Sequence, residues 1–433
     1  MIKLNKNFEE TKMDQALITL IILVIVALLF LTEIIPVAVS ALSATVALVF
    51  FGILTPQEAF SGFSNSNVIL FSGMFVVGVA MLESGLAQTI GNFIVRKVGG
   101  TQHALIPAFM VLTIVLSAFA SNTGTVACLL PVIIGVCLSA KIPSAPILMS
   151  VAVAANVGCN LTMVGTPPNM LAVAEVSSAG LEPYGFFEFA LIGGPIALAT
   201  SLFMFFIGRH ILPKKSADTG LLTRQIGNVG TNRQRILSLV ILIYVVIGLI
   251  VGIPGLSPAM VSLTAALFCV ITGCITEKQA YKGIDWVTVF LFAGMLPFAI
   301  AMQKSGAGEF IANSVVSILG DTPSEHAIVA VLFLIACFLT QFMPNTATAA
   351  LIIPIALSIA NKLQVSPYGV IMSVTIGASC SFATPIATPC NTMILGPSGL
   401  HFKDYLKVGI PMCIMSLILC VLLIPIFWPF VET

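Results

Sequence analysis

The sequence predicts an all-α polytopic membrane protein built from two inverted repeats. Of its 433 residues, 58% are hydrophobic and 8% are charged, whereas about a quarter of the residues of a water-soluble domain are charged. The apolar segments are long enough to cross a bilayer as helices, which takes about 20 residues. They lack the alternation of a membrane β-barrel. Composition therefore indicates an integral membrane protein.

Short motifs of the first half recur in the same order in the second half, at offsets of 221 to 223 positions. Ser121-Asn122-Thr123-Gly124-Thr125 corresponds to Pro344-Asn345-Thr346-Ala347-Thr348, and Gly165-Thr166-Pro167-Pro168-Asn169 corresponds to Ala387-Thr388-Pro389-Cys390-Asn391. The recurrence predicts an N-terminal segment (1–15), a first repeat (16–212), a linker (213–235) and a second repeat (236–430).

Each repeat is expected to contain five crossings and one hairpin that enters the membrane and turns back. The first repeat places crossings near 16–32, 36–54, 67–83, 145–176 and 189–212, with the hairpin at 104–140. The second places them near 236–252, 258–275, 288–303, 368–398 and 406–430, with the hairpin at 326–362. Lysines precede the first apolar run as in a signal peptide, but a counterpart in the second repeat favours a crossing.

An odd number of crossings per repeat inverts the second copy relative to the first. With the linker in the cytoplasm, 13 of the 18 Lys and Arg residues lie inside and 5 outside, as the positive-inside rule requires. This threading puts both termini outside the plasma membrane, the inner membrane of a bacterium. Inverted repeats with interrupted helices are typical of secondary transporters.

The two polar tips, at 121–125 and 344–348, are the predicted binding site. Non-helical backbone at membrane depth is tolerated only where it is buried in protein or lines a cavity. No Lys or Arg lies in the middle of an apolar segment, so an anion would rely on free N–H groups and the positive dipole ends of helices. Asn and Thr side chains add donors, and their oxygens suit a cation.

A second set of oxygens lies beside the tips. Ser117 and Thr340 each precede a tip by four residues, which places a hydroxyl one helical turn away. The prolines after Gly165 and Ala387 cannot continue a helical hydrogen-bond ladder, so they free carbonyl groups for Na⁺. Polar side chains in membrane helices often join helices instead, but the duplication, the helix breaks and the opposite entry sides favour binding.

Other polar groups carry less functional signal. The ten cysteines show no metal-ligand spacing and are expected to be small buried hydrophobic residues. Glu33, Glu83, Glu175 and Glu188 fall at segment ends and are expected to be solvated or interfacial. A cation/proton antiporter needs a carboxylate in the middle of a segment, and none is found there. No His-Glu-x-x-His, paired aspartates or Ser/His pair indicates an intramembrane enzyme.

The paired tips, followed by Gly165-Thr166-Pro167-Pro168-Asn169 and Ala387-Thr388-Pro389, resemble the divalent anion/sodium symporter family, which carries dicarboxylates, citrate or sulfate. The resemblance spans nearly the whole chain. It implies a homodimer in the lipid bilayer, in which a transport domain moves as an elevator against a scaffold. It further implies one Na⁺ site at Ser117, Ser121, Asn122 and Gly165, a second at Thr340, Met343, Asn345 and Ala387, and anion contacts from Asn122, Thr123, Asn345, Thr346, Thr388 and Pro389.

The chain departs from the family pattern in three ways. Pro344 replaces a serine and removes a hydroxyl and an N–H at the second cation site. The chain has ten expected crossings instead of eleven. Gly396-Pro397-Ser398-Gly399 and Phe402-Lys403-Asp404-Tyr405 are more similar to a branch that carries inorganic anions.

These features favour Na⁺-coupled symport of a small divalent anion, with C4-dicarboxylates ahead of sulfate. The alternatives are a symporter of sulfate or another inorganic anion and a Na⁺-independent dicarboxylate exchanger. Nucleic acid is not an expected partner.

Overall fold

The structure is a computed structural model that describes residues 2–85, 89, 97, 101–213, 230–251, 253–319 and 323–430. Within these residues the ordered elements are helices, apart from an isolated β-bridge between Ile253 and Leu256. This confirms the all-α prediction. The predicted linker lies largely outside the described residues, as does the segment between Gly85 and Thr101 except for two positions.

The first half runs from the N-terminal helix to a short helix, α11, that follows a π-helical segment, η3. Its helix α1 begins much earlier than the expected crossing near residue 16, so the predicted N-terminal segment continues the same helix. The elements are α1 (Ile2–Thr32), α2 (Val37–Phe50), α3 (Pro56–Phe60), η1 (Ser61–Ser64), α4 (Ser66–Glu83), α6 (Gln102–Ser117), α7 (Asn122–Ala140), α8 (Ala145–Gly158), η2 (Cys159–Leu161), α9 (Pro167–Ser178), α10 (Ala190–Phe203), η3 (Met204–Gly208) and α11 (Arg209–Ile211).

The second half repeats this order. Each predicted long crossing that contains a Thr-Pro break, 145–176 and 368–398, is divided into two helices. The elements are α12 (Asn232–Val251), α13 (Pro258–Ile271), α14 (Glu277–Gly283), α15 (Trp286–Ser305), α16 (Ala307–Leu319), α17 (Glu325–Leu339), α18 (Asn345–Leu363), α19 (Pro367–Ser379), α20 (Pro389–Ser398) and α21 (Phe402–Phe427).

The protein is a multi-pass membrane protein. Among the described residues, seven helices are long and apolar enough to cross a bilayer, and further apolar helices have 10–17 residues. The seven span Asp14–Thr32, Pro56–Glu83, Ala190–Ile211, Asn232–Val251, Trp286–Ser305, Asn345–Leu363 and Phe402–Phe427.

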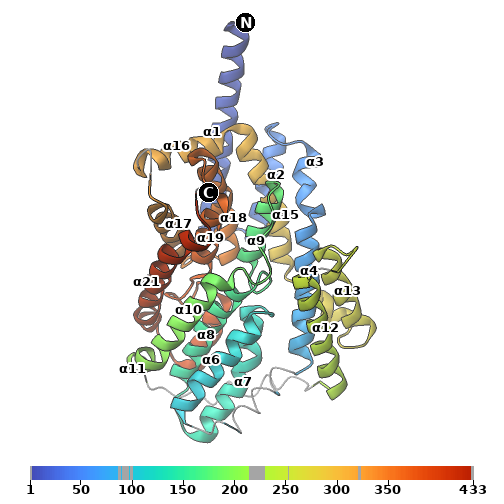
Figure 1. Ribbon diagram of the computed structural model, residues 1–433, viewed down its shortest axis with the longest axis vertical. Helices are drawn as coiled ribbons and strands as arrows, with labels where there is room; N and C mark the ends of the chain where they lie inside the picture. Colours follow the sequence, from blue (N-terminus) through green and yellow to red (C-terminus); the bar gives the residue numbers. More distant parts are fainter. Residues whose placement is uncertain are drawn as a thin grey trace.

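The helices form two bundles (Figure 1). One bundle contains α2, α4, α12, α13 and α15, and the other contains α6 to α10 together with α17 to α21. In Figure 1, α6 and α7 lie in the lower part of the second bundle and α17 and α18 in its upper part. The two hairpins therefore approach the middle of the molecule from opposite ends.

In the first bundle, helices of the two halves pack against each other, and each contact made by one half has an equivalent made by the other. The rings of Phe71 and Phe292, which are counterparts in the two halves, meet at a centroid distance of 4.8 Å. Gly73 lets α4 approach α13 so closely that a Cβ there would lie 2.8 Å from the backbone of Ser262. Its counterpart Gly294 does the same for α15 against Ala41 of α2, at 3.0 Å. A residue that meets its own counterpart lies on a two-fold axis, so these contacts support the predicted duplication.

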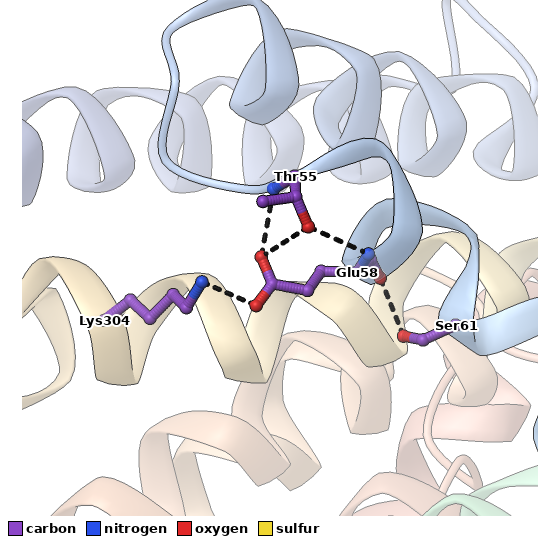
Figure 2. A network of polar contacts seen from close by, with 4 residues as sticks. All are labelled: Thr55, Glu58, Ser61 and Lys304. Atoms are coloured by element: carbon purple, nitrogen blue, oxygen red, sulfur yellow. Dashed lines mark hydrogen bonds and ion pairs between the residues drawn. The ribbon is translucent and has the colours of Figure 1, made fainter.

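Polar contacts at the ends of α4 and α15 also join the two halves reciprocally. Thr55 and Glu58 form a capping box at the start of α3, and Glu58 also pairs with Lys304 at the end of α15, with Oε1 and Nζ 2.5 Å apart (Figure 2). The counterpart of Glu58 is Gln279, which caps α14 in the same way and donates from Nε2 to Glu83 Oε2 at 3.1 Å. Each half therefore fastens one short helix to the long helix of the other half.

Candidate functional site

A cavity of about 830 Å³ lies between the two bundles, and both predicted tips line it. Four helices begin at this cavity: α7 after the first tip, α18 after the second, and α9 and α20 after the two Thr-Pro breaks. The first N–H groups of a helix have no partner inside the helix, and its N-terminus carries a partial positive charge. The cavity is therefore surrounded by four positive helix ends.

The first tip is shaped by hydrogen bonds from short polar side chains. Ser121 caps α7, because its Oγ accepts the N–H of Gly124 at 3.1 Å. Below it, Ser117 is fully buried and donates from Oγ to the carbonyl of Ala155 at 2.7 Å. The hairpin is thereby fastened to α8, while the lone pairs of the Ser117 hydroxyl remain available to a cation.

The second tip repeats this arrangement with one change. Thr340 Oγ1 lies 2.7 Å from the carbonyl of Ala378, which matches the bond made by Ser117, and 2.8 Å from Oδ1 of Asn345. Pro344 occupies the capping position and makes no side-chain capping bond. Asn345 instead donates from Nδ2 to the hydroxyl of Ser381 at 3.2 Å. The amide of Asn345 is thus oriented by Thr340 and Ser381, whereas the amide of Asn122 donates to Asn156.

The two breaks are closed by the same amide clamp. Asn169 donates from Nδ2 to the carbonyl of Thr162 at 2.9 Å, and Asn391 donates from Nδ2 to the carbonyl of Thr384 at the same distance. Gly165 lies against the Cys159 carbonyl so closely that a Cβ would collide with it. The last asparagine of each Thr-Pro motif therefore stabilises the non-helical turn beside the cavity.

The structure brings most of the predicted site residues together. The predicted residues that line the cavity are Ser121, Asn122, Thr123, Gly165, Asn345, Thr346, Ala387, Thr388 and Pro389. Ser117, Thr340 and Met343 are buried and are not part of the lining. Ser117 and Thr340 lie one turn before the tips, and Met343 directly precedes Pro344. The hairpins that carry them pack against α8 and α19.

Sequence reasoning missed Asn156, which connects the two halves at this site. It is buried in α8, accepts from Nδ2 of Asn122 at 2.9 Å, and donates from its own Nδ2 to Oδ1 of Asn391 at 3.1 Å. The matching bonds of Ser117 to Ala155 and of Thr340 to Ala378 make Ser379 its counterpart in the second half, so the repeat comparison gave no matching amide. An amide within the apolar run of α8 was the available clue, because polar side chains at membrane depth are costly.

The charged groups of the cavity are acidic. Glu33 and Asp285 line it, and no Lys, Arg or His is present in the described lining. Asp285 caps α15, accepting from the N–H of Thr288 at 3.2 Å and from its hydroxyl at 2.5 Å. Two carboxylates on the side of the first bundle therefore face the positive helix ends of the second bundle.

Two expectations about other polar residues have opposite outcomes. The cysteines were expected to be buried, and they are, apart from the half-buried Cys413. Glu175 was expected to be solvated or interfacial, and this is wrong, because the side chain is buried with 2% exposure. Glu175 belongs to α9, which packs against α18 and α19.

Comparison with known proteins identifies relatives over nearly the whole chain. The sequence model of the citrate transporter family matches residues 27–351 and 322–431. An uncharacterized transporter of Haemophilus influenzae is 28% identical, over 94% of this chain and 91% of the relative. The uncharacterized transporter YfbS of Escherichia coli is 24% identical, over 94% and 98%. The sodium-dependent dicarboxylate transporter SdcS of Staphylococcus saprophyticus is 24% identical, over 95% and 86%.

Solved structures show the same fold. The YdaH transporter of Alcanivorax borkumensis superposes with a TM-score of 0.64 over 88% of each chain, at 15% identity. MtrF of Neisseria gonorrhoeae gives 0.59 over 89% of this chain and 85% of its own, also at 15% identity. At this identity the likeness concerns the fold alone.

Proposed function

Because the chain belongs to the citrate transporter family, we propose that it is a secondary active transporter that carries small divalent anions, C4-dicarboxylates first, together with Na⁺. Its family and relatives are transporters and not enzymes. The observation that carries the proposal is the convergence of four helix N-termini on one cavity that contains both polar tips.

The tips account for recognition of a dicarboxylate. In this proposal Asn122 and Thr123 bind one carboxylate, Asn345 and Thr346 bind the other, and Thr388 with Pro389 lies beside them. Backbone N–H groups at helix starts bind anions without a basic side chain. A four-carbon acid presents its carboxylates at two ends, as the opposed tips require, whereas sulfate presents all its oxygens at one centre.

The acidic lining supports coupling to a cation. A divalent anion enters a cavity that already contains Glu33 and Asp285 and no described basic side chain, so bound Na⁺ is needed to offset the repulsion. One Na⁺ is assigned to Ser117, Ser121, Asn122 and the carbonyl of Gly165. A second is assigned to Thr340, Asn345 and the carbonyls of Met343 and Ala387. The names of the SdcS relatives support the same coupling.

The two bundles support an elevator mechanism. The second bundle carries both tips and both breaks, so it is the proposed transport domain, and the first bundle is the proposed scaffold within a homodimer. With the linker in the cytoplasm, the cavity opens to the inside, because Glu33, Leu82, Gly283 and Asp285 lie at predicted cytoplasmic helix ends. Both hairpins would be re-entrant, and the chain would lie in the bacterial inner membrane with external termini.

Uptake into proteoliposomes tests this proposal directly. Labelled succinate, citrate and sulfate are offered with an inward Na⁺ gradient and with choline in place of Na⁺. We expect Na⁺-dependent uptake of succinate that unlabelled fumarate and malate inhibit, and weak inhibition by sulfate or butyrate. Equal succinate uptake in choline would favour the Na⁺-independent exchanger, and preferred uptake of sulfate would assign the chain to inorganic anions.

A variant of one tip sharpens the test of substrate class. Thr123→Val removes a hydroxyl at one tip and leaves the opposite tip unchanged, so affinity for succinate should fall while affinity for a monocarboxylate stays low. The control is Thr272→Val at the end of α13, whose hydroxyl donates to the carbonyl of Phe268 and which is not part of the described cavity lining. Equal loss of succinate affinity in both variants would remove Thr123 from the site.

A further inference from the structure

A buried carboxylate lies at the opposite end of α9 from the proposed substrate site. Glu175 is 2% exposed, and its side chain makes no hydrogen bond or ion pair within the part of the chain that the structure describes. Buried acidic side chains are normally paired, since an isolated ionised carboxylate is very costly to remove from water. A group of this kind inside a membrane protein points to function.

A second cavity, of about 860 Å³, reaches this carboxylate. It lies between the two bundles, with α9 and α18 on one side and η1 and α15 on the other. Ser178 continues the α9 wall, while Asn65 and Gln303 face it from the other bundle. In Figure 1 the neighbouring α3 and α16 lie at the upper end of the molecule, away from the hairpin formed by α6 and α7. Water entering this cavity can bring a proton to Glu175.

No cation on the packed elements neutralises Glu175. In the same cavity Lys362 of α18 pairs with Glu309 of α16, with Nζ and Oε1 4.0 Å apart. On α15, Lys304 pairs with Glu58. On α4, Glu83 accepts from Gln279, and α19 contains no charged residue. The neutral, protonated acid is therefore the form that suits this environment.

We propose that Glu175 is a proton-binding site that exchanges its proton with solution through the second cavity, and that this exchange is linked to the transport cycle. The proton comes from water and returns to water, leaving the carboxylate ionised. The link rests on the proposed function: α9 lines the substrate cavity with Pro167 and the second cavity with Glu175, so movement of the second bundle changes the hydration of both ends. The protein would then use a proton in addition to Na⁺.

Infrared spectroscopy of the purified protein tests the proton site without any substrate. At neutral pH exposed carboxyl groups are ionised, so a protonated carboxyl C=O band reports buried acids. We expect such a band, a shift of the band in D₂O, and its reversible loss as the pH is raised. Glu175→Gln should abolish it, because glutamine has the shape of the neutral acid but no carboxyl group. Glu309→Gln, on an exposed side chain of the same cavity, should leave it intact.

The absence of a neutral carboxyl band at all pH values, or a band that Glu175→Gln leaves unchanged, would overturn the proposal and indicate an ionised group that binds a cation. If Glu175→Gln does not fold, the D₂O shift and the pH titration of the unmodified protein still decide whether a buried acid exchanges its proton.

Proton movement during transport tests the link to the cycle. A pH-sensitive dye inside the proteoliposomes should report a proton flux that accompanies succinate uptake at a fixed Na⁺ gradient. This flux should vanish in Glu175→Gln and persist in Glu309→Gln. An equal flux in all three proteins would overturn the link. If the unmodified protein transports none of the anions, the proposed function fails, while the infrared result still reports on the proton site.

Discussion

Asparagine amides are the residues on which the proposed site depends most. The amides of Asn122 and Asn345 lie at the starts of α7 and α18, and each is oriented by a neighbour: Asn156 at the first tip, and Thr340 with Ser381 at the second. An amide presents both a donor and an acceptor, so one side chain can face an anion and a cation together. Alanine offers neither group.

Asn122→Ala and Asn345→Ala should each reduce Na⁺-driven succinate uptake to less than about a tenth of normal. Without the amide, a carboxylate oxygen of bound succinate has no hydrogen-bond donor, which costs roughly 1–3 kcal/mol of binding free energy. Expression and the gel-filtration profile should be unchanged. The matched control is Asn232→Ala, an exposed asparagine at the start of α12 whose Oδ1 accepts from Arg235. Near-normal uptake by either tip variant would exclude that asparagine from the site.

Asn156 has a different role, because it touches both halves of the site without lining the cavity. Asn156→Ala removes the acceptor of Asn122 Nδ2 and the Nδ2 donor to the side-chain Oδ1 of Asn391, so thermal stability should fall by about 1–3 kcal/mol. Na⁺ affinity should fall as well, since Asn122 loses its orientation. Thermal unfolding with and without Na⁺ measures both effects. Unchanged stability together with unchanged Na⁺ affinity would show that the bridge is dispensable.

At the scale of elements, the breaks between α8 and α9 and between α19 and α20 are the features that make a site possible. An uninterrupted helix would satisfy its own backbone groups and offer nothing to a ligand. Here prolines end the ladder, asparagine amides close the turn, and the next helix begins at the cavity wall. The break is also tightly packed, so its geometry is sensitive to added atoms.

Gly165→Ala should therefore impair Na⁺-dependent uptake, because its Cβ would collide with the Cys159 carbonyl and displace a carbonyl assigned to Na⁺. We expect the Na⁺ concentration for half-maximal uptake to rise at least about tenfold, which corresponds to about 1.4 kcal/mol. Gly194→Ala, in the middle of α10 with open space around it, is the control. It should leave transport intact and add helix stability. Identical Na⁺ dependence in both variants would contradict the assignment of this carbonyl.

The whole molecule joins two halves through reciprocal contacts, and its binding sites are shared between them. Phe71 meets Phe292 at the centre of the first bundle, while Asn156 joins Asn391 in the second. Both proposed Na⁺ sites include the tip asparagine that also faces the anion. Ions and substrate bound at such sites stabilise the same arrangement of the tips, so their binding is expected to be coupled.

Coupling of this kind is reciprocal: Na⁺ must raise the affinity for succinate by the same factor by which succinate raises the affinity for Na⁺. Calorimetric titration of succinate at zero and saturating Na⁺, with choline as replacement, and of Na⁺ at zero and saturating succinate, should give equal factors greater than about five. Equal succinate affinity with and without Na⁺ would favour the exchanger.

The class of protein, the helical fold and the two tips could all be predicted from the sequence. An unpaired backbone amide in hydrocarbon is costly wherever it occurs, so the residues at that position in the sequence already indicate where a helix is interrupted. A polar pentapeptide or a Thr-Pro motif inside an apolar run is visible without knowing what surrounds it. The partners of a buried side chain cannot be predicted in this way, because no local sequence pattern indicates them. Asn156 and Glu175 belong to helices whose neighbours lie far along the chain, and only packing decided that one bridges two halves and the other is enclosed. The reciprocal pairs Phe71–Phe292 and Glu58–Lys304 were likewise set by tertiary structure, since which helices pack together depends on the shape of every side chain between them.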